Sequence, residues 1–229
     1  AGCHFKDGRG RSPACSGEAP TGYLVRLGVP GMLTPTGDPV GHVNYGNQIQ
    51  DASILGVETE ATVVLDYEII SGTFVDGTPY TLRKPIISFQ DEAFGSIDGV
   101  ALSPRVANQM SGLGLLEAIP EEDILALADP DDLDGDGISG RPNFVWNISE
   151  QRRTLGRFGW KAEQPTVRQQ VASAFIGDMG LTTSLFPEQN CRAISTACNE
   201  AIGGGSPEVE DRNLDHVELY AAALAVPGR

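Results

Sequence analysis

The N-terminal third of the chain alternates short β-like runs with segments rich in Gly and Pro. Three runs of β-favouring residues occupy positions 23–27, 61–70 and 80–89. Asp76-Gly77 separates the last two runs, and a tight hairpin turn needs the positive φ that Gly adopts at little cost. The pattern predicts a loop-rich region with a small sheet and a β-hairpin over residues 1–102.

From about residue 103 the apolar spacing becomes helical. Acidic residues follow Pro120, where they would lie at the positive end of a helix, and Pro165 is suited to a first helical turn. Near the C-terminus Leu214, Val217, Ala221 and Leu224 fall on one helical face. The pattern predicts helices at 106–116, 120–128 and 165–180 and one that starts after Pro207. We therefore expect a mainly α fold with a small β-hairpin or sheet and long loops.

Composition narrows the class of protein. The chain has 229 residues and a formal net charge of -15, which argues against a nucleic-acid partner because phosphate binding needs clustered Lys and Arg. No stretch of about 18 apolar residues occurs, so no membrane span is expected. These features favour a periplasmic or secreted protein.

Four cysteines lie at positions 3, 15, 191 and 198. The spacing of Cys191 and Cys198 around a short polar loop suits a local disulfide, which would indicate an oxidising compartment; two free thiols are the alternative. Cys3 and Cys15 could also pair with each other. If Cys3 holds a cofactor, Cys15 is left without an assigned role.

An acidic loop gives the strongest purely local signal. Asp132, Asp134 and Asp136 alternate and are followed by Gly137 and Ile138. Carboxylates at positions one, three and five, with a turn glycine and a backbone carbonyl at Ile138, follow the rule for a calcium loop. Asn143 stands where an EF-hand has its bidentate Glu, so we expect a weaker Ca²⁺ site or one completed by other ligands. A solvated acidic turn is the alternative.

The chain begins with Ala1-Gly2-Cys3-His4, which matches the end of a Cys-x-x-Cys-His haem-attachment motif. In such a motif two thiols bind the porphyrin and the histidine ligates iron. Cys3 is then the second thiol and His4 the proximal iron ligand, and the first cysteine would lie one position upstream. An accidental Cys-His pair or a zinc site would give the same four residues.

Five segments, the first of which contains this start, occur in one order: AGCHFKDGRGRSPA, GLGLLEAIP, DLDGDGISGRPNFVW, LGRFGWKAEQPTVRQQVASAFIGDMGLT and PEVEDRNLDHVELYAAALAVP. Together they resemble the di-haem oxidoreductase family, also labelled CxxC-motif thiol oxidoreductases and related to bacterial di-haem cytochrome c peroxidases. The resemblance implies haem c and a cytochrome c-like haem domain with insertions. It also implies that residues 1–229 form one N-terminal haem-bearing domain, with a second haem domain downstream.

The resemblance assigns catalytic roles by position. Trp160 matches the electron relay, Gln170 the distal amide and Asp178 the acid-base carboxylate. The match departs from the peroxidases because the acid is Asp rather than Glu and lies closer to the Gln. Each residue also has a structural interpretation, as a core aromatic, a helix-surface amide and a loop residue bonded to backbone.

Other residues are weaker candidates around a haem. Met179 could be an axial ligand or a packing residue, and His42 a distal ligand or a surface residue. Arg105 or Arg157 could pair with haem propionates. Glu117 is unusual within an apolar helix, where we favour a structural hydrogen bond, and we expect His216 to be a boundary side chain of the last helix.

These features predict a periplasmic c-type haem oxidoreductase that resembles cytochrome c peroxidase and reduces peroxide or a related small-molecule oxidant. Electrons would come from a second haem domain or a small electron-donor protein. One alternative is an electron-transfer cytochrome in which His42 or Met179 closes the iron site. Another is a haem-free, calcium-stabilised secreted binding domain in which Cys3 pairs with Cys15.

Overall fold

The computed structural model describes residues 2–5, 8–17 and 22–226, and these residues form five short α-helices and three two-stranded antiparallel sheets. Helices account for only 20% of the chain and strands for 25%. The expectation of a mainly α, cytochrome c-like fold is therefore wrong. The chain is a loop-rich mixture of small sheets and short helices, which divides into two compact units.

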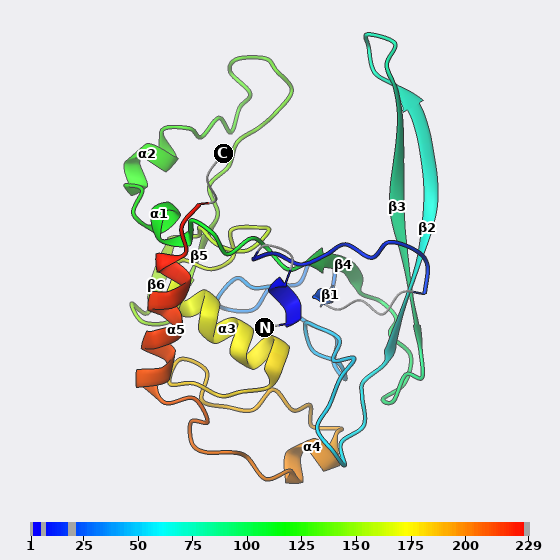
Figure 1. The fold of residues 1–229 in the computed structure, drawn as a ribbon, viewed down its shortest axis with the longest axis vertical. Coiled ribbons are helices and arrows are strands. Elements are labelled where there is room, and N and C mark those ends of the chain that lie inside the picture. The colour runs from blue at the N-terminus through cyan, green and yellow to red at the C-terminus, as the bar shows by residue number, and fades with distance from the viewer. Residues whose placement is uncertain (1, 6–7, 18–21, 227–229) are drawn as a thin grey trace. The chain divides into compact units, whose positions relative to one another are not determined.

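The first unit comprises Ala1–Met32, Pro39–Ala107 and Arg192–Ala201. Its two sheets are β1 paired with β4 and β2 paired with β3 (Figure 1). Its elements are the 3-10 helix η1 (Gly2–His4), β1 (Tyr23–Gly28), β2 (Thr62–Thr73), β3 (Pro79–Gln90), β4 (Ala101–Val106) and α4 (Thr196–Glu200). One hydrophobic core serves this unit, built around Val25, Leu27, Tyr45, Ile49 and Ala61.

Strands β2 and β3 form a long hairpin, which we call the ribbon. The register pairs Thr62 with Gln90 at its base and Thr73 with Pro79 near its tip. At the turn Gly77 has φ +85°, and the Asp76 carboxylate accepts the Thr78 N–H at 2.9 Å. The hairpin predicted from Asp76-Gly77 is confirmed, and it extends past the runs that the hydrophobic pattern marked.

The second unit comprises Leu33–Asp38, Asn108–Cys191 and Ile202–Arg229. Its elements are α1 (Leu113–Glu117), α2 (Glu121–Leu125), β5 (Phe144–Asn147), β6 (Arg152–Leu155), α3 (Val167–Met179) and α5 (Asp211–Ala223). Helices α3 and α5 pack together, and fully buried side chains hold them: Val167, Ala172, Leu214 and Ala221.

Strand pairing and helix capping explain why the helices are shorter than predicted. Val106 ends strand β4, and Gly112 in the left-handed region starts α1, so most of 106–116 is not helical. Thr166 caps α3, so Pro165 lies just before the helix and not in its first turn, while Gly180 with φ 65° ends the helix as expected. On α5, Leu214 and Ala221 are completely buried, which confirms the predicted apolar face.

Within the described residues, none of the helices combines the length and hydrophobicity that crossing a bilayer requires.

Candidate functional site

The predicted haem-attachment residues lie on η1 at the start of the described chain. Cys3 is exposed and His4 is half-buried. Gly22, with φ +75°, lies directly against this turn, because a Cβ added to it would come within 2.6 Å of the Cys3 carbonyl oxygen. A glycine is therefore required for the chain to hold η1 at this distance.

The donor types in η1 suit a c-type haem. Covalent attachment uses thioether bonds, and the exposed Cys3 offers one thiol; the adjacent His4 offers an imidazole nitrogen from the same turn. The hydroxyl of Tyr23, the residue after Gly22, is buried and makes no hydrogen bond within the described residues. Burial raises the pKa of Tyr23 to about 12, so this hydroxyl remains a neutral donor.

His42 lies in a tight loop in which it and Gly46 exchange two backbone hydrogen bonds of 2.7 and 2.8 Å. Its Nδ1 accepts the Asn44 N–H at 3.2 Å, and its ring lies 5.2 Å from that of Tyr45. A neutral imidazole that accepts at Nδ1 carries its proton on Nε2. Iron binding through Nε2 would therefore cost the bond from Asn44, and this disfavours His42 as a distal ligand.

The three catalytic candidates all belong to the second unit. Trp160 follows β6 and is 61% exposed, while Gln170 is half-buried on α3 and Asp178 is exposed at the end of the same helix. Eight positions of helix separate Gln170 from Asp178, a distance of about 12 Å along the axis. The two groups can line one pocket but cannot contact one another. Met179, the axial-ligand candidate, is 53% exposed.

Gln169, which precedes Gln170 on α3, is the buried amide of the two. Its Oε1 accepts the Ile148 N–H at 2.9 Å, and its Nε2 donates to the Trp146 carbonyl and to Gln164 Oε1, both at 3.0 Å. The side chain joins the first turn of α3 to the end of β5. The sequence gives no signal for this residue, because only the orientation of α3 shows which of the two adjacent glutamines points into the interior.

Glu117 has the structural role that we favoured. Its Oε1 accepts the Val167 N–H at 2.8 Å, and Thr166 Oγ1 accepts the Gln169 N–H at 3.1 Å. Two side chains thus satisfy backbone donors at the positive end of α3. Glu117 comes from α1, so it also ties these two helices together.

The basic and histidine candidates are placed as follows. Arg157 donates from Nη1 to the Leu116 and Ile119 carbonyls at 3.1 and 2.7 Å, and so caps the end of α1. Arg105 belongs to the other unit, where its Nε donates to Ser103 at 3.3 Å. His216 is exposed on α5.

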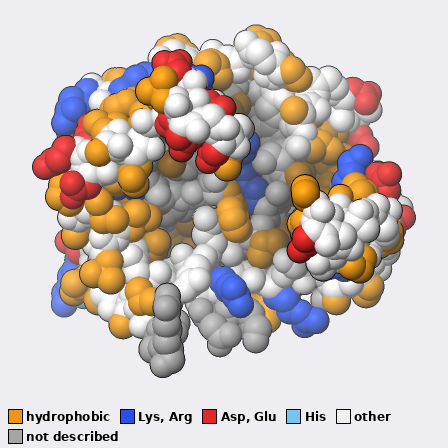
Figure 2. All heavy atoms as spheres, turned by 90° about the horizontal axis from the view of Figure 1, so that it is seen from above, with side chains coloured by type: hydrophobic (Ala, Val, Ile, Leu, Met, Phe, Trp, Pro, Cys, Tyr) orange, Lys and Arg blue, Asp and Glu red, His pale blue; other side chains and the backbone are white. Residues whose placement is uncertain are grey.

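The acidic loop is closed by a bridge in which Asp129 and Gly140 exchange two hydrogen bonds of 2.9 Å. Asp129, Asp132 and Asp134 offer carboxylate oxygens that all lie within 4.8 Å of one another, the one such group found among the described residues. Asp136 lies outside this group, and its Oδ1 accepts the Ile138 N–H at 2.8 Å. The structure therefore adds Asp129 to the predicted loop ligands. Figure 2, which views the molecule from above, shows acidic side chains at the surface in this region.

The predicted Cys191–Cys198 disulfide is present. Within the loop that it closes, the Arg192 carbonyl accepts the Ser195 N–H at 3.0 Å and the Asn199 side-chain amide at 2.8 Å. Cys15 is a free and exposed thiol, so the alternative pairing of Cys3 with Cys15 does not occur.

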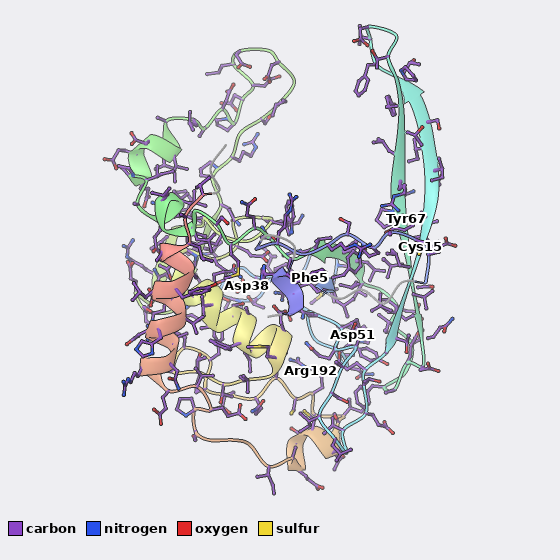
Figure 3. All side chains as sticks on the ribbon, viewed as in Figure 1. Phe5, Cys15, Asp38, Asp51, Tyr67 and Arg192 are labelled. Carbon is purple, nitrogen blue, oxygen red and sulfur yellow. The ribbon has the colours of Figure 1, made fainter. Side chains whose placement is uncertain are left out.

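One titrating carboxyl was not anticipated. Glu60 precedes β2 and accepts the Gln50 N–H at 2.8 Å through Oε2. Burial raises its pKa to about 7, although that hydrogen bond and nearby Arg192 oppose the shift. The sequence could not reveal this carboxyl, because Glu60 lies in an ordinary polar stretch. Both its partial burial and its proximity to Arg192 arise only in the folded chain. Figure 3 labels Arg192 and Asp51, which both belong to this unit.

Comparison with known proteins gives one family. The model of the family described as "Di-haem oxidoreductase, putative peroxidase" matches residues 26–229. Cys3 and His4 precede the matched range, whereas all three catalytic candidates lie inside it. No curated protein and no solved structure matches the chain.

Proposed function

Because the chain belongs to the di-haem oxidoreductase family, we propose that it is a periplasmic c-type haem enzyme that reduces peroxide or a related small oxidant. The family match over residues 26–229 is the observation that carries this proposal. The Cys191–Cys198 disulfide supports an oxidising compartment. Electrons would reach the haem from a second haem domain or a small electron-donor protein.

Cys3 and His4 are the residues that would hold the haem. The exposed Cys3 thiol would form a thioether bond and the His4 imidazole would be the proximal ligand. When bound, the haem supplies a redox-active iron that can transfer electrons to an oxidant. Gly22 lets the chain pass directly against Cys3, since any larger residue there would displace the Cys3 backbone.

The side chains of α3 and of the segment before it would handle the proton and the electron. Gln170 would orient the oxidant through its amide N–H, and the Asp178 carboxylate would accept a proton and return it. Their separation of about 12 Å along the helix leaves room for a small substrate or water between them. Trp160, with its indole largely exposed, would be the aromatic relay.

A pyridine haemochrome spectrum of the full-length exported protein tests the cofactor. We expect a c-type α-band that survives in His216→Ala, which removes an exposed histidine of α5. His4→Ala should lower the height of the band per protein, because haem would no longer be held at Cys3 and His4. A wild-type protein without haem would overturn the redox proposal.

Peroxide turnover tests the catalytic residues. Asp178→Asn should lower kcat by about 10²-fold or more because proton transfer is lost. Gln151→Ala changes an exposed amide and should leave turnover unchanged. A Soret band that does not respond to peroxide in the wild type would instead favour the electron-transfer cytochrome. The hydrogen bond at His42 Nδ1 argues against that alternative through His42.

We also propose that the acidic loop binds Ca²⁺ to fix its shape. Asp129, Asp132 and Asp134 are gathered within reach of one hard cation. In a calorimetric titration Asp132→Asn should weaken binding by about tenfold or more, whereas Asp136→Asn should have a smaller effect. Equal effects of the two variants would show that the ligands are Asp132, Asp134 and Asp136, as in a standard calcium loop, and not the group Asp129, Asp132 and Asp134.

A further inference from the structure

The ribbon has two different faces. Side chains alternate along a strand, so the odd-numbered residues of β2 and their partners in β3 share one side. On that side Val63, Ile87 and Phe89 pack against the core of the unit, and Leu65 is buried. We call it the core face. The even-numbered residues of β2 and their partners form the opposite side.

Nearer the tip of the ribbon, the segment 13–17 lies over the core face. The Tyr67 hydroxyl donates to the Pro13 carbonyl at 3.1 Å, and Arg83 donates to the Ala14 carbonyl at 2.7 Å while lying 4.3 Å from the Tyr67 ring centre. Figure 3 shows Cys15 beside Tyr67 where this segment meets the ribbon. The core face is therefore covered as far as Tyr67, and Ile69 beyond it is 59% exposed.

The opposite side, which we call the apolar face, is bare. Ile70 is 40% exposed, Leu82 57%, Ile86 48% and Phe74 60%. Tyr80 lies across Gly72, where an added Cβ would meet its hydroxyl at 2.5 Å, and its ring contacts that of Phe74 in a tilted arrangement with ring centres 5.0 Å apart. A two-stranded hairpin alone is marginal in water, and a line of exposed apolar side chains indicates a surface that something covers.

One ion pair crosses the middle of the apolar face. Lys84 and Glu68 are opposite one another in the register and lie 3.2 Å apart, and both side chains are more than half exposed. Ile86 lies on one side of this pair and Ile70 with Leu82 on the other. The tip half of this face is therefore apolar beyond the ion pair. Toward the base Asp66, the partner of Ile86, adds a second carboxylate, which accepts the Ser16 hydroxyl at 2.6 Å, and the last pairs include Thr62, Ser88 and Gln90.

The Glu68–Lys84 pair is complementary to itself. If two apolar faces stack with a two-fold axis along the length of the ribbons, each β2 lies opposite the β3 of the other copy. Glu68 then faces Lys84 of the second copy, and Ile70 faces Leu82 of the second copy. Sheets that pack face to face lie about 10 Å apart, so these side chains meet between them.

The edges of the ribbon are less suited to association. The Gly17 N–H donates to the outward Leu65 carbonyl at 3.1 Å, so the base of the β2 edge is already used. That bond also shows that the backbone N–H and C=O groups of the odd-numbered β2 residues point away from β3. In the same register the backbone of Pro85 points away from β2, at the other edge of the ribbon. Proline has no N–H to offer there, which discourages addition of a strand.

From these features we propose that the apolar face of the β2–β3 ribbon is a homodimer interface that binds the same face of a second copy of this chain. The alternation of side chains along the strands places Ile70, Leu82 and Tyr80 on this one side of the ribbon. This inference is independent of the proposed enzymatic function, because no haem or catalytic residue takes part in it.

Sedimentation velocity of the full-length protein over a range of concentrations tests the interface. Ile70→Asp should raise the dimer dissociation constant by at least about 30-fold, as for a central interface residue. Ile69→Asp is the matched control: the same substitution, one residue away, on the core face where Arg83 is its cross-strand neighbour. It should change the dissociation constant by less than about threefold.

Charge reversal gives a second test that keeps the apolar side chains. Lys84→Glu should weaken the dimer, because it places two carboxylates together within and between copies. Adding Glu68→Lys restores opposite charges in both places and should recover the wild-type dissociation constant to within about threefold. Circular dichroism of each monomer shows whether the hairpin remains folded.

Three results would overturn the proposal. The first is a wild-type protein that stays monomeric at all concentrations. The second is an equal loss of the dimer in Ile69→Asp and Ile70→Asp, and the third is no recovery in the Glu68→Lys, Lys84→Glu double variant with the hairpin folded.

Discussion

The β2–β3 ribbon and the α3–α5 helix pair keep their structure in different ways. The ribbon is held by a ladder of local backbone hydrogen bonds, and Leu65 is its only completely buried residue. The helix pair buries Val167, Ala172, Leu214 and Ala221 completely. Local pairing can be lost without disturbing the rest of a domain, whereas loss of buried packing affects the whole unit.

Charges also act differently in the two regions. Arg168 of α3 donates to Asp215 and Glu218 of α5 and lies 3.3 Å from Asp211, with only 26% of its side chain exposed. On the ribbon, the Lys84–Glu68 pair is mostly exposed and contributes little to folding. The first set joins two helices, while the second is available to a partner.

The largest effect is expected in the helix pair. Leu214→Ala removes a fully buried side chain and should lower the free energy of unfolding by about 3 kcal/mol, because it leaves a cavity between α3 and α5. Leu219→Ala, on the exposed side of the same helix, should cost less than about 0.5 kcal/mol. Chemical denaturation followed by circular dichroism measures both. Similar losses would mean that the buried contact is not what joins the helices.

The base of the ribbon should respond to pH through Glu60. Its pKa is raised to about 7 in the folded state, so the folded chain holds the proton more tightly than the unfolded chain, and stability falls as pH rises from about 4.3 to 7. Glu60→Gln keeps an acceptor for the Gln50 N–H and should be about 2 kcal/mol more stable than wild type at pH 8, but not at pH 4. Glu58→Gln, at an exposed position, should leave the pH profile unchanged. A Glu60→Gln profile parallel to that of the wild type would contradict the burial of this carboxyl.

A smaller effect with the opposite pH dependence is expected next to α5. The Glu208 carboxylate accepts the Gly204 and Thr182 N–H groups at 2.9 and 3.0 Å, and these bonds lower its pKa. Glu208→Gln should cost about 1 to 2 kcal/mol near neutral pH. The difference from wild type should vanish as pH falls below about 4 through the lowered pKa, because the native carboxylate is then protonated.

Glu210→Gln is the control for this carboxylate, since the Glu210 side chain does not cap α5. Urea denaturation at several pH values measures both variants. A constant difference between Glu208→Gln and wild type down to pH 3 would be inconsistent with a stabilising charge at Glu208.

The smallest effect is expected at the tip of the ribbon. Gly77 has φ +85°, so Gly77→Ala should cost about 1 kcal/mol locally. Hydrogen exchange should quicken for the ribbon amides near the tip, while global stability changes little. Thr81→Ala, at an exposed position of β3 outside the turn, serves as the control. Loss of protection throughout the unit would show that the ribbon does not fold independently of its core.

Local chemistry explains which elements were predictable. Asp76-Gly77, the Gly180 helix end and the apolar face of α5 depend on residues close in sequence, and each was predicted. The Cys191–Cys198 disulfide follows from short spacing in the same way. The predicted helix at 106–116 is mostly absent because Val106 pairs with Tyr23 far away in sequence, and such pairing overrides a local apolar pattern.

The candidate site also divides into features that local sequence predicted and contacts that depend on distant residues. The motif pattern that pointed to the di-haem oxidoreductase family is supported by the match over residues 26–229, and the roles of Trp160, Gln170 and Asp178 remain predictions. Contacts at long range could not be anticipated: Glu117 capping α3, Gln169 bonded to β5, and Asp129 in the acidic group.

The sequence by itself determined the family, the hairpin turn, the disulfide and the acidic character of the calcium-type loop, because each rests on residue types at short spacing. Only the tertiary structure decided that the chain is not mainly helical, that Glu60 is half-buried with a raised pKa, and that one side of the ribbon is covered at its base while Ile70, Leu82 and Ile86 on the other side are exposed. Strand pairing and burial depend on which distant segments meet, and a linear pattern contains no measure of that.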